Sequence, residues 1–239
     1  MNKSMAASMV ACGLLGSMAI SGTFAYLTDA DKVFNTFTVG DVKIETLEPN
    51  YPGNDSEAVK DLVPNEEVTK DPQVKNTGVN DAIVFMEVEV PVKDVTYVNP
   101  DGRKGVQEPA ELFWFKDEAD PQGTFANHWS DKWTDLSDSK GEQGIADGTT
   151  TTYVFAYNTP IAKGEVTEPL FDKIQLKNIL ENEVLPGQVQ DIVVTTYAIQ
   201  STEILSGDRD LTDLTDGKLS QSSLEEIYDI YVRQNRQEH

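Results

Sequence analysis

The stretch Ala-Ile-Val-Phe-Met-Glu-Val-Glu-Val-Pro-Val, residues 82–92, decides the fold class. Every second residue is apolar, and the residues between them change from isoleucine and phenylalanine to two glutamates. A period of two is that of a β-strand. The pattern predicts a strand buried on both faces at its start and on one face thereafter. Because proline has no amide hydrogen, we expect Pro91 to end central pairing.

Further β-patterns occur on both sides of this strand, separated by loops rich in proline, glycine and asparagine. The strongest turn signal is Asn99-Pro100-Asp101-Gly102. With the first strand they make at least seven strand candidates, which predicts an all-β antiparallel sandwich. The other candidates lie within residues 33–45, 62–78, 112–116, 129–136, 149–158, 167–178 and 191–200.

The C-terminal segment has a different pattern. Residues 201–219 form an acidic loop, and Ser222-x-x-Glu225 is a capping box that predicts a helix over Ser223–Arg236. Apolar side chains then recur at helical spacing and form one stripe. We expect the helix to pack on the sandwich or on a neighbouring subunit. The stripe consists of Leu224, Ile227, Tyr228, Tyr231 and Val232.

The N-terminal segment is typical of an export signal. It runs uncharged from Met5 to Phe24 and ends with small residues at Thr23 and Ala25, as a signal peptidase requires. We expect cleavage after Ala25, so that residues 1–25 are removed and Tyr26 becomes the first residue. The alternative is an anchor retained in the membrane, since the segment is almost long enough to span it.

Residues 26–45 predict a β-rich arm that cleavage would free. Residues 33–39 alternate in one phase, Val42 and Ile44 resume in the other, and the slip at Gly40-Asp41 suits a bulge. We expect three further parts: the arm at 26–45, a sandwich core at 46–200, and the loop with its helix at 201–239. The one cysteine, Cys12, lies in the signal, so the mature chain has no disulfide.

Several separated blocks of the sequence resemble the TasA/camelysin family of secreted Gram-positive proteins. The first comprises Gly-Thr-Phe-Ala-Tyr-Leu-Thr-Asp (22–29) and Asn-Thr-Phe-Thr-Val-Gly-Asp-Val (35–42). The others are Leu-Val-Pro (62–64) with Lys-Asp-Pro-x-Val-x-Asn-x-Gly (70–78), and Tyr-Val-Phe-Ala-Tyr-Asn-Thr-Pro (153–160) with Pro-Leu-Phe-Asp-Lys-Ile-Gln-Leu-Lys-Asn (169–178). The resemblance covers about residues 13–200 and leaves the tail outside.

The resemblance implies a jelly-roll sandwich, processing by a SipW-type signal peptidase, and an extracellular or cell-surface location. It also implies a structural subunit of biofilm-matrix fibres, which polymerises head to tail with itself by donating the arm to the next subunit, with accessory matrix proteins as further partners. The membrane would be contacted only through the uncleaved signal. The arm's inserted side chains would be Phe34, Phe37, Val39, Val42 and Ile44.

The charge balance argues against nucleic acid and anionic membranes as partners. The chain has 19 basic and 41 acidic residues among 239, a net charge of −22. Such a surplus favours an extracellular protein, with calcium as the one candidate ion. Carboxylate oxygens suit calcium, but the run of aspartates at residues 208–216 lacks EF-hand spacing, and its interpretation as an acidic loop without a bound ion is favoured. The run consists of Asp208, Asp210, Asp213 and Asp216.

Catalytic motifs are absent from the sequence. The only histidines are His128 and His239, and there is no His-Glu-x-x-His, Gly-x-Ser-x-Gly or Walker loop. We therefore expect no enzyme and no cofactor, although the camelysin branch of the family has been described as metallopeptidases, which stays as the least favoured alternative.

The three tryptophans raise a second alternative, a surface adhesin or ligand-binding sandwich. Trp114, Trp129 and Trp133 lie in two neighbouring aromatic segments. They predict either a carbohydrate-stacking surface or cross-strand aromatic pairs in the core, and the core interpretation is favoured.

Overall fold

The structure is a computed structural model, which describes residues 42–60, 62–99, 101–118, 126–141, 150–180, 183 and 191–235. The predicted signal, its cleavage site and most of the arm lie outside the described residues. So does the slip at Gly40-Asp41.

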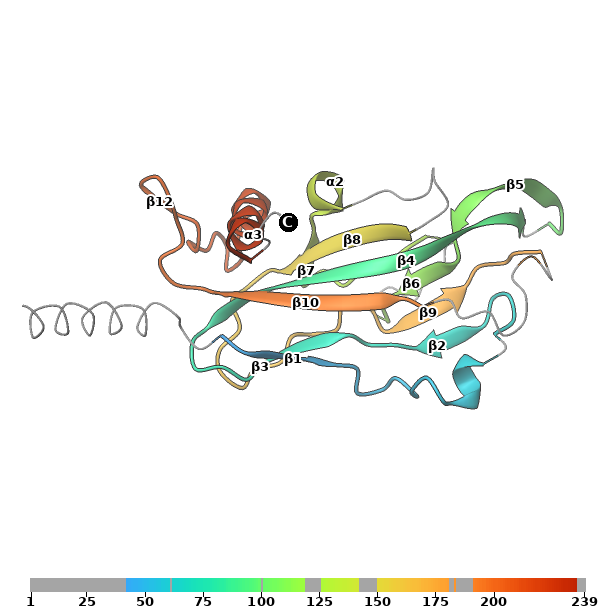
Figure 1. Ribbon diagram of the computed structural model, residues 1–239, viewed down its shortest axis with the longest axis horizontal. Coiled ribbons are helices and arrows are strands. Elements are labelled where there is room, and N and C mark those ends of the chain that lie inside the picture. Colours follow the sequence, from blue (N-terminus) through green and yellow to red (C-terminus); the bar gives the residue numbers. More distant parts are fainter. Residues whose placement is uncertain are drawn as a thin grey trace, which may run out of the picture. The chain divides into compact units, whose positions relative to one another are not determined.

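The first sheet is antiparallel and is built around one long strand (Figure 1). Its strand order is β10-β4-β8-β7, and β5 pairs with the C-terminal part of β4, from Val92 to Val98. Two short helical segments, η1 (Glu57–Val59) and α2 (Ser137–Lys140), and the small hairpin of β11 (Leu205–Ser206) and β12 (Arg209–Asp210) lie in the connections. The strands of the sheet are β4 (Ala82–Val98), β5 (Lys104–Glu111), β7 (Trp133–Asp135), β8 (Thr150–Tyr157) and β10 (Val193–Gln200).

The second layer consists of two short ladders joined by an extended segment. β1 (Ile44–Leu47) pairs with β3 (Gln73–Asn76), and β9 (Lys173–Leu176) lies between β2 (Glu67–Thr69) and β6 (Phe113–Lys116). Backbone hydrogen bonds from residues 164–172 to residues 70–76 connect the ladders. The described part of the chain is thus mostly antiparallel β-structure in two layers, as the sequence predicted.

β4 is longer than predicted, because Pro91 does not end it. The strand continues to Val98, and Pro91 lies where its neighbour changes from β8 to β5. The carbonyl of Pro91 accepts a hydrogen bond from the Leu112 amide. Proline therefore costs the strand only the one hydrogen bond that a backbone N–H at position 91 would donate. The predicted turn follows: the amide of Gly102, at φ 78°, donates to the Asn99 carbonyl.

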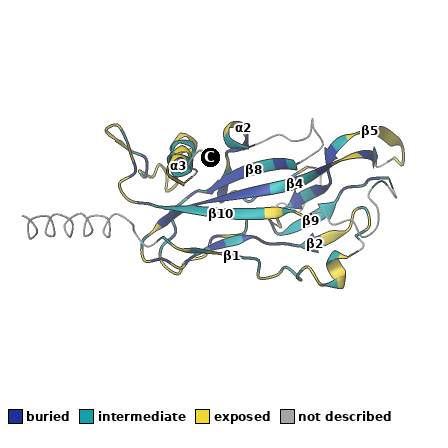
Figure 2. Cartoon of the chain, in the orientation of Figure 1, coloured by how far each residue is buried: buried dark blue, intermediate teal, exposed yellow. Residues whose placement is uncertain are grey.

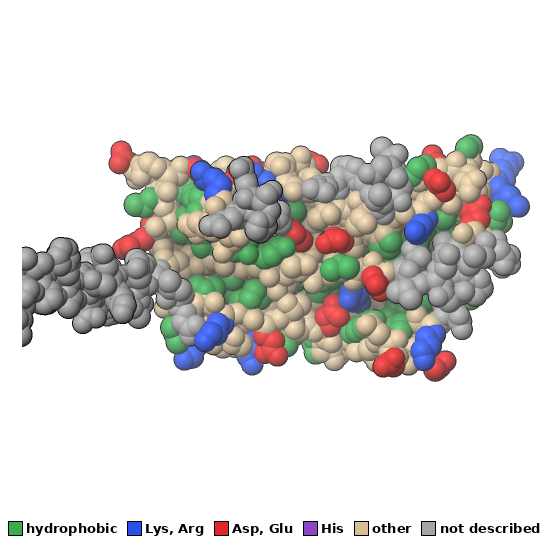
Figure 3. Space-filling model, viewed as in Figure 1, with side chains coloured by type: hydrophobic (Ala, Val, Ile, Leu, Met, Phe, Trp, Pro, Cys, Tyr) green, Lys and Arg blue, Asp and Glu red, His purple; other side chains and the backbone are tan. Residues whose placement is uncertain are grey.

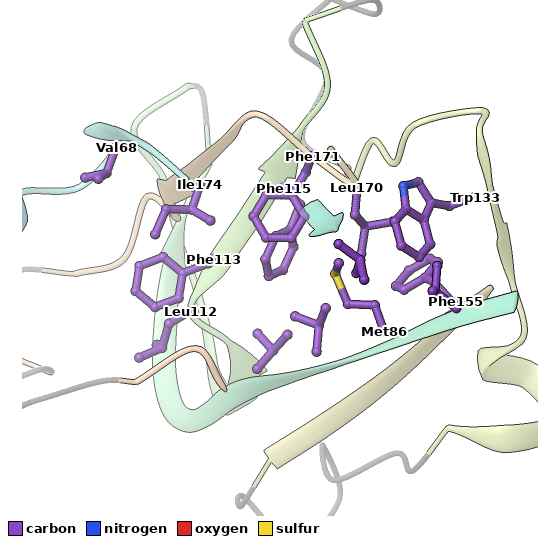
Figure 4. Packing of buried hydrophobic residues seen from close by; sticks show 14 of the residues in the cluster. Val68, Met86, Leu112, Phe113, Phe115, Trp133, Phe155, Leu170, Phe171 and Ile174 are labelled. Carbon is purple, nitrogen blue, oxygen red and sulfur yellow. The ribbon is translucent and has the colours of Figure 1, made fainter. Parts of the chain in front are cut away.

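The main core lies between the two layers. Apolar side chains of β4 and β8 meet those of β6, β9 and the connecting segment, and Figure 4 shows Met86, Phe155, Phe115, Leu170 and Phe171 pointing toward one another. β4 and β8 are largely dark blue in Figure 2, whereas β10 is intermediate along most of its length.

The predicted helix exists and covers the other face of the first sheet. α3 (Gln221–Asn235) packs Leu224, Ile227 and Tyr228 against Ile83 and Phe85, the residues expected to bury the second face of β4. The predicted capping box is wrong. The helix begins at Gln221, two residues before the predicted start at Ser223. The Ser220 hydroxyl accepts a hydrogen bond from the Ser223 amide at 3.1 Å, so Ser220 is the N-terminal cap.

Candidate assembly surface

The most distinctive functional feature of the fold is a seam between two edge strands. β10 is the last strand of the first sheet, and β1 is the outer strand of its ladder with β3. The two approach each other, and the Thr46 and Thr196 hydroxyl oxygens lie 2.6 Å apart in a hydrogen bond. Among the described residues no strand pairing joins β1 to β10. The seam is therefore a place where two sheets meet without a shared backbone ladder.

The side chains beside the seam are apolar. Val194 and Ala198 of β10 are partly buried against the main core, as are Val42 and Ile44 on the other side. Figure 3 looks onto this face, where hydrophobic side chains (green) occur over β10 and β1. An exposed edge with apolar side chains suits pairing with a further strand.

The described end of the predicted arm belongs to this surface. Val42 and Ile44 contact their own chain's core, and β1 extends from Ile44 to Leu47, across the predicted boundary between arm and core at residues 45 and 46. Phe34, Phe37 and Val39 lie outside the described residues, as do Thr23, Ala25 and Tyr26.

The three tryptophans do not form one surface. The indole of Trp133 is 5% exposed and donates from Nε1 to the Glu168 carbonyl, while Trp129 stacks on Phe115 with 4.5 Å between ring centroids. Trp114 is half-buried, with the Lys177 ammonium 3.7 Å from its ring centroid. Trp129 and Trp133 thus contribute to the core, which leaves no shared stacking platform.

The acidic residues that the structure describes do not assemble into a metal site. The described residues include no group of three or more His, Cys, Asp or Glu side chains that could hold a metal ion. In the predicted calcium run, Asp210 accepts from the amide and hydroxyl of Thr212, hydrogen bonds that lower its pKa. Asp208, Asp213 and Asp216 are exposed, and His128 lies in the connection before β7.

A hollow of about 400 Å³ brings other carboxylates near one another, but each has a protein partner. Asp71 accepts from the amide and side chain of Asn50, Asp172 accepts from the Glu118 amide at 2.7 Å, and Glu118 pairs with Lys173 at 3.2 Å. Burial raises the pKa of Asp172, with the charges of Asp117 and Glu118 adding to it. The hollow is lined by Asn50, Thr69, Asp71, Glu118, Asp172 and Lys173.

A buried ionic cluster lies at the end of β5, around Glu111. The Lys177 ammonium lies 3.7 Å from the Glu111 carboxylate, and both side chains are almost fully buried. Glu111 also accepts the Tyr153 hydroxyl at 2.7 Å, and its carbonyl accepts the Tyr97 hydroxyl at 3.0 Å. Burial lowers the pKa of Lys177 to about 8, against the opposing effect of Glu111. Burial also raises the pKa of Tyr97 to about 12 and raises that of Tyr153, with Glu111 contributing to both.

Sequence reasoning missed Thr46 and Thr196. Thr196 lies in a segment that was correctly assigned as β-structure, whereas the first predicted strand ended at residue 45, one residue before Thr46. An edge strand, moreover, cannot be recognised from its own alternation. Its status depends on which strands pair, and here that follows from β10 joining β4 and β1 joining β3. No local signal in the sequence marks the meeting of the two edges.

The fold and the seam define the class: an all-β sandwich with a C-terminal helix, in which two edge strands adjoin without a shared ladder among the described residues. The profile of the camelysin metallo-endopeptidase family matches residues 1–127 of the 239. The chain therefore belongs to this family. No curated protein and no solved structure matches it. In the described part of the chain no helix is long and apolar enough to cross a membrane.

Proposed function

We propose that this protein is a secreted structural subunit of extracellular fibres, assembled by strand donation from the N-terminal arm. The observation that carries the proposal is the seam, where β1 and β10 present adjoining edges without a common ladder. Membership in the camelysin family and the sequence pattern of residues 26–41 support it.

The physical basis is β-augmentation. An extended segment that adds to a free edge gains main-chain hydrogen bonds, and alternate side chains enter the apolar layer. Residues 26–41 comprise 16 positions, which span roughly 50 Å when extended at about 3.3 Å each. That is enough to run along the eight residues of β10. An arm at one place and an acceptor at another make a heterologous contact, which generates open filaments.

The proposal includes no catalysis. Although the family's description names a metallo-endopeptidase, the donor sets among the described residues do not fit a metal ion. The carboxylates that line the hollow are engaged with Asn50, the Glu118 amide and Lys173. We expect purified protein to leave casein intact with or without added zinc. Metal-dependent hydrolysis that survives repurification and disappears in a chelator would favour the peptidase alternative.

The test of the fibre function compares two chains by negative-stain microscopy and size-exclusion chromatography. The first is Tyr26–His239; the second is Val42–His239, which lacks residues 26–41 of the arm but retains all of β1. We expect filaments from the first and monomers from the second. Monomers from both, at high concentration and with or without calcium, would overturn the proposal. A chain that begins at Thr46 is a poorer control, because it also removes half of β1.

Export and assembly are linked in this proposal, since cleavage before Tyr26 would free the arm. We expect a chain blocked at the site by Ala25→Phe to stay with the cell and to form no fibres. Equal fibre growth by blocked and processed chains would separate assembly from cleavage.

A further inference from the structure

The seam has a property that goes beyond accepting a strand: its two edges are held together by a contact within the same chain. Thr196 lies opposite Met86 in the ladder with β4, and Thr46 lies opposite Val74 in the ladder with β3. Met86 and Val74 both belong to the main core, so the two threonines project from the sides of their strands that face it. Their hydroxyls meet at 2.6 Å, between Val194 and Ala198 of β10.

The distance between the hydroxyls excludes an inserted strand. Neighbouring strands lie about 4.8 Å apart, so a strand between β1 and β10 would need them about 9.6 Å apart. Two short side chains that touch at 2.6 Å hold their strands closer than this. The closed seam and a seam filled by a neighbour's arm are therefore alternative states of the subunit.

The contact is also weaker than the ladders on either side of it. β1 is bound to β3 by a ladder of four residue pairs, while the hydrogen bond described between β1 and β10 is exposed and joins two side chains. Such a bond contributes about 0.5–1.5 kcal/mol. The seam can thus open without disturbing either ladder, as a conformational gate requires.

We propose that the Thr46–Thr196 contact is a gate that closes the acceptor seam in the free subunit and must part before a second copy's arm can enter. The inference rests on the proposed fibre function. It assigns the regulation of assembly to the acceptor side, in addition to release of the arm on the donor side. The gate delays the first pairing event and is no longer needed once the arm's own ladder has formed.

The experiment locks the gate with a disulfide. In Tyr26–His239 the variant Thr46→Cys/Thr196→Cys carries the only two cysteines, because Cys12 precedes the cleavage site. The parent hydroxyls already point at one another, which favours a disulfide with its sulfurs about 2.05 Å apart. A short thiol-to-thiol crosslinker joins the same two cysteines if oxidation is incomplete. The matched controls are the reduced double variant and each single variant under the same oxidant.

The outcomes separate the gate from the fibre function. We expect the oxidised variant to stay monomeric and the reduced one to form fibres. Fibre growth by oxidised and reduced protein at equal rates would overturn the gate and leave the fibre function standing. Absence of fibres from the unmodified Tyr26–His239 chain would overturn the fibre function itself.

A second variant tests the gate from the opposite direction. Thr46→Ala/Thr196→Ala removes the hydrogen bond while leaving both ladders, so fibres should appear with a lag about two- to tenfold shorter. Circular dichroism and the elution volume of fresh protein check that the fold is kept. An unchanged or longer lag in a folded variant would contradict the gate.

Discussion

At the scale of single residues, the buried Lys177 makes stability depend on pH in an unusual direction. Its pKa in the folded chain is about 8, below the ordinary 10.5, so the unfolded chain holds more protons between these values. Stability must then rise with pH across that window. The cost of burying the charged lysine is present in full below pH 8 and is relieved above it.

Two tyrosines in the same cluster limit this rise. Because the pKa of Tyr97 is raised from 10 to about 12, and that of Tyr153 is also raised, the folded chain keeps protons that the unfolded chain loses above pH 10. We expect the free energy of unfolding to increase by on the order of 1–3 kcal/mol from pH 7.5 to 9.5 and to fall beyond pH 10. Urea unfolding across this range measures it.

A variant tests whether Lys177 causes the increase in the free energy of unfolding. Lys177→Met should remove the increase between pH 7.5 and 9.5, and at pH 7.5 it should cost on the order of 3–5 kcal/mol, because Glu111 remains buried without its cation. Lys163→Met, at an exposed position, serves as the control and should keep the wild-type profile. Parallel profiles for wild type and Lys177→Met would contradict the argument.

Gly141 gives a second prediction at this scale. A Cβ added there would lie 2.5 Å from the Thr152 carbonyl oxygen and 2.9 Å from that of Ser137, both fixed in the backbone. Gly141→Ala should therefore destabilise the chain by about 1–3 kcal/mol. At Gly105 the same addition meets only the Tyr97 carbonyl oxygen at 3.4 Å. Thermal unfolding of the two variants decides between this steric cost and a general effect of replacing glycine, which would lower both equally.

At the scale of elements, the start of α3 distinguishes two assignments of its cap. The sequence favoured Ser222, whereas the hydroxyl that accepts the Ser223 amide belongs to Ser220. Ser220→Ala should cost about 0.5–2 kcal/mol, and Ser222→Ala, inside an exposed first turn, should cost a few tenths at most. Denaturant midpoints of the two variants measure the difference. A larger loss at Ser222 would restore the predicted capping box.

The same elements indicate how far sequence reasoning can reach. The β-patterns located β4, β8 and β10, and the helical stripe located α3, because burial directly dictates these patterns. The stripe left open whether the helix packs on the sandwich or on a neighbouring subunit, and the structure places it against Ile83 and Phe85. What sequence reasoning missed depends on pairing. Pro91 was expected to end a strand that changes neighbours there, and Thr46 and Thr196 acquire a role only when two distant edges meet. The ionic pair of Glu111 and Lys177 likewise unites residues 66 positions apart, and no local period records such a contact.

At the scale of the whole molecule, directional assembly predicts two kinds of chain terminator. Val42–His239 retains the seam but lacks residues 26–41 of the arm, so it can accept a neighbour and cannot donate. The oxidised Thr46→Cys/Thr196→Cys chain has the arm but a closed seam, so it can donate and cannot accept. In a head-to-tail filament each should stop growth at a different end.

The measurement is the length of fibres grown from short seeds of Tyr26–His239 with a small fraction of either terminator. We expect each alone to block one end and to leave growth at the other, and both together to stop elongation altogether. Reduction of the disulfide should restore growth at its end alone, which the armless chain cannot do. If neither terminator shortens the fibres, subunits add through a surface other than the arm and the seam. If both block the same end, donor and acceptor are not the separate surfaces that an open filament requires.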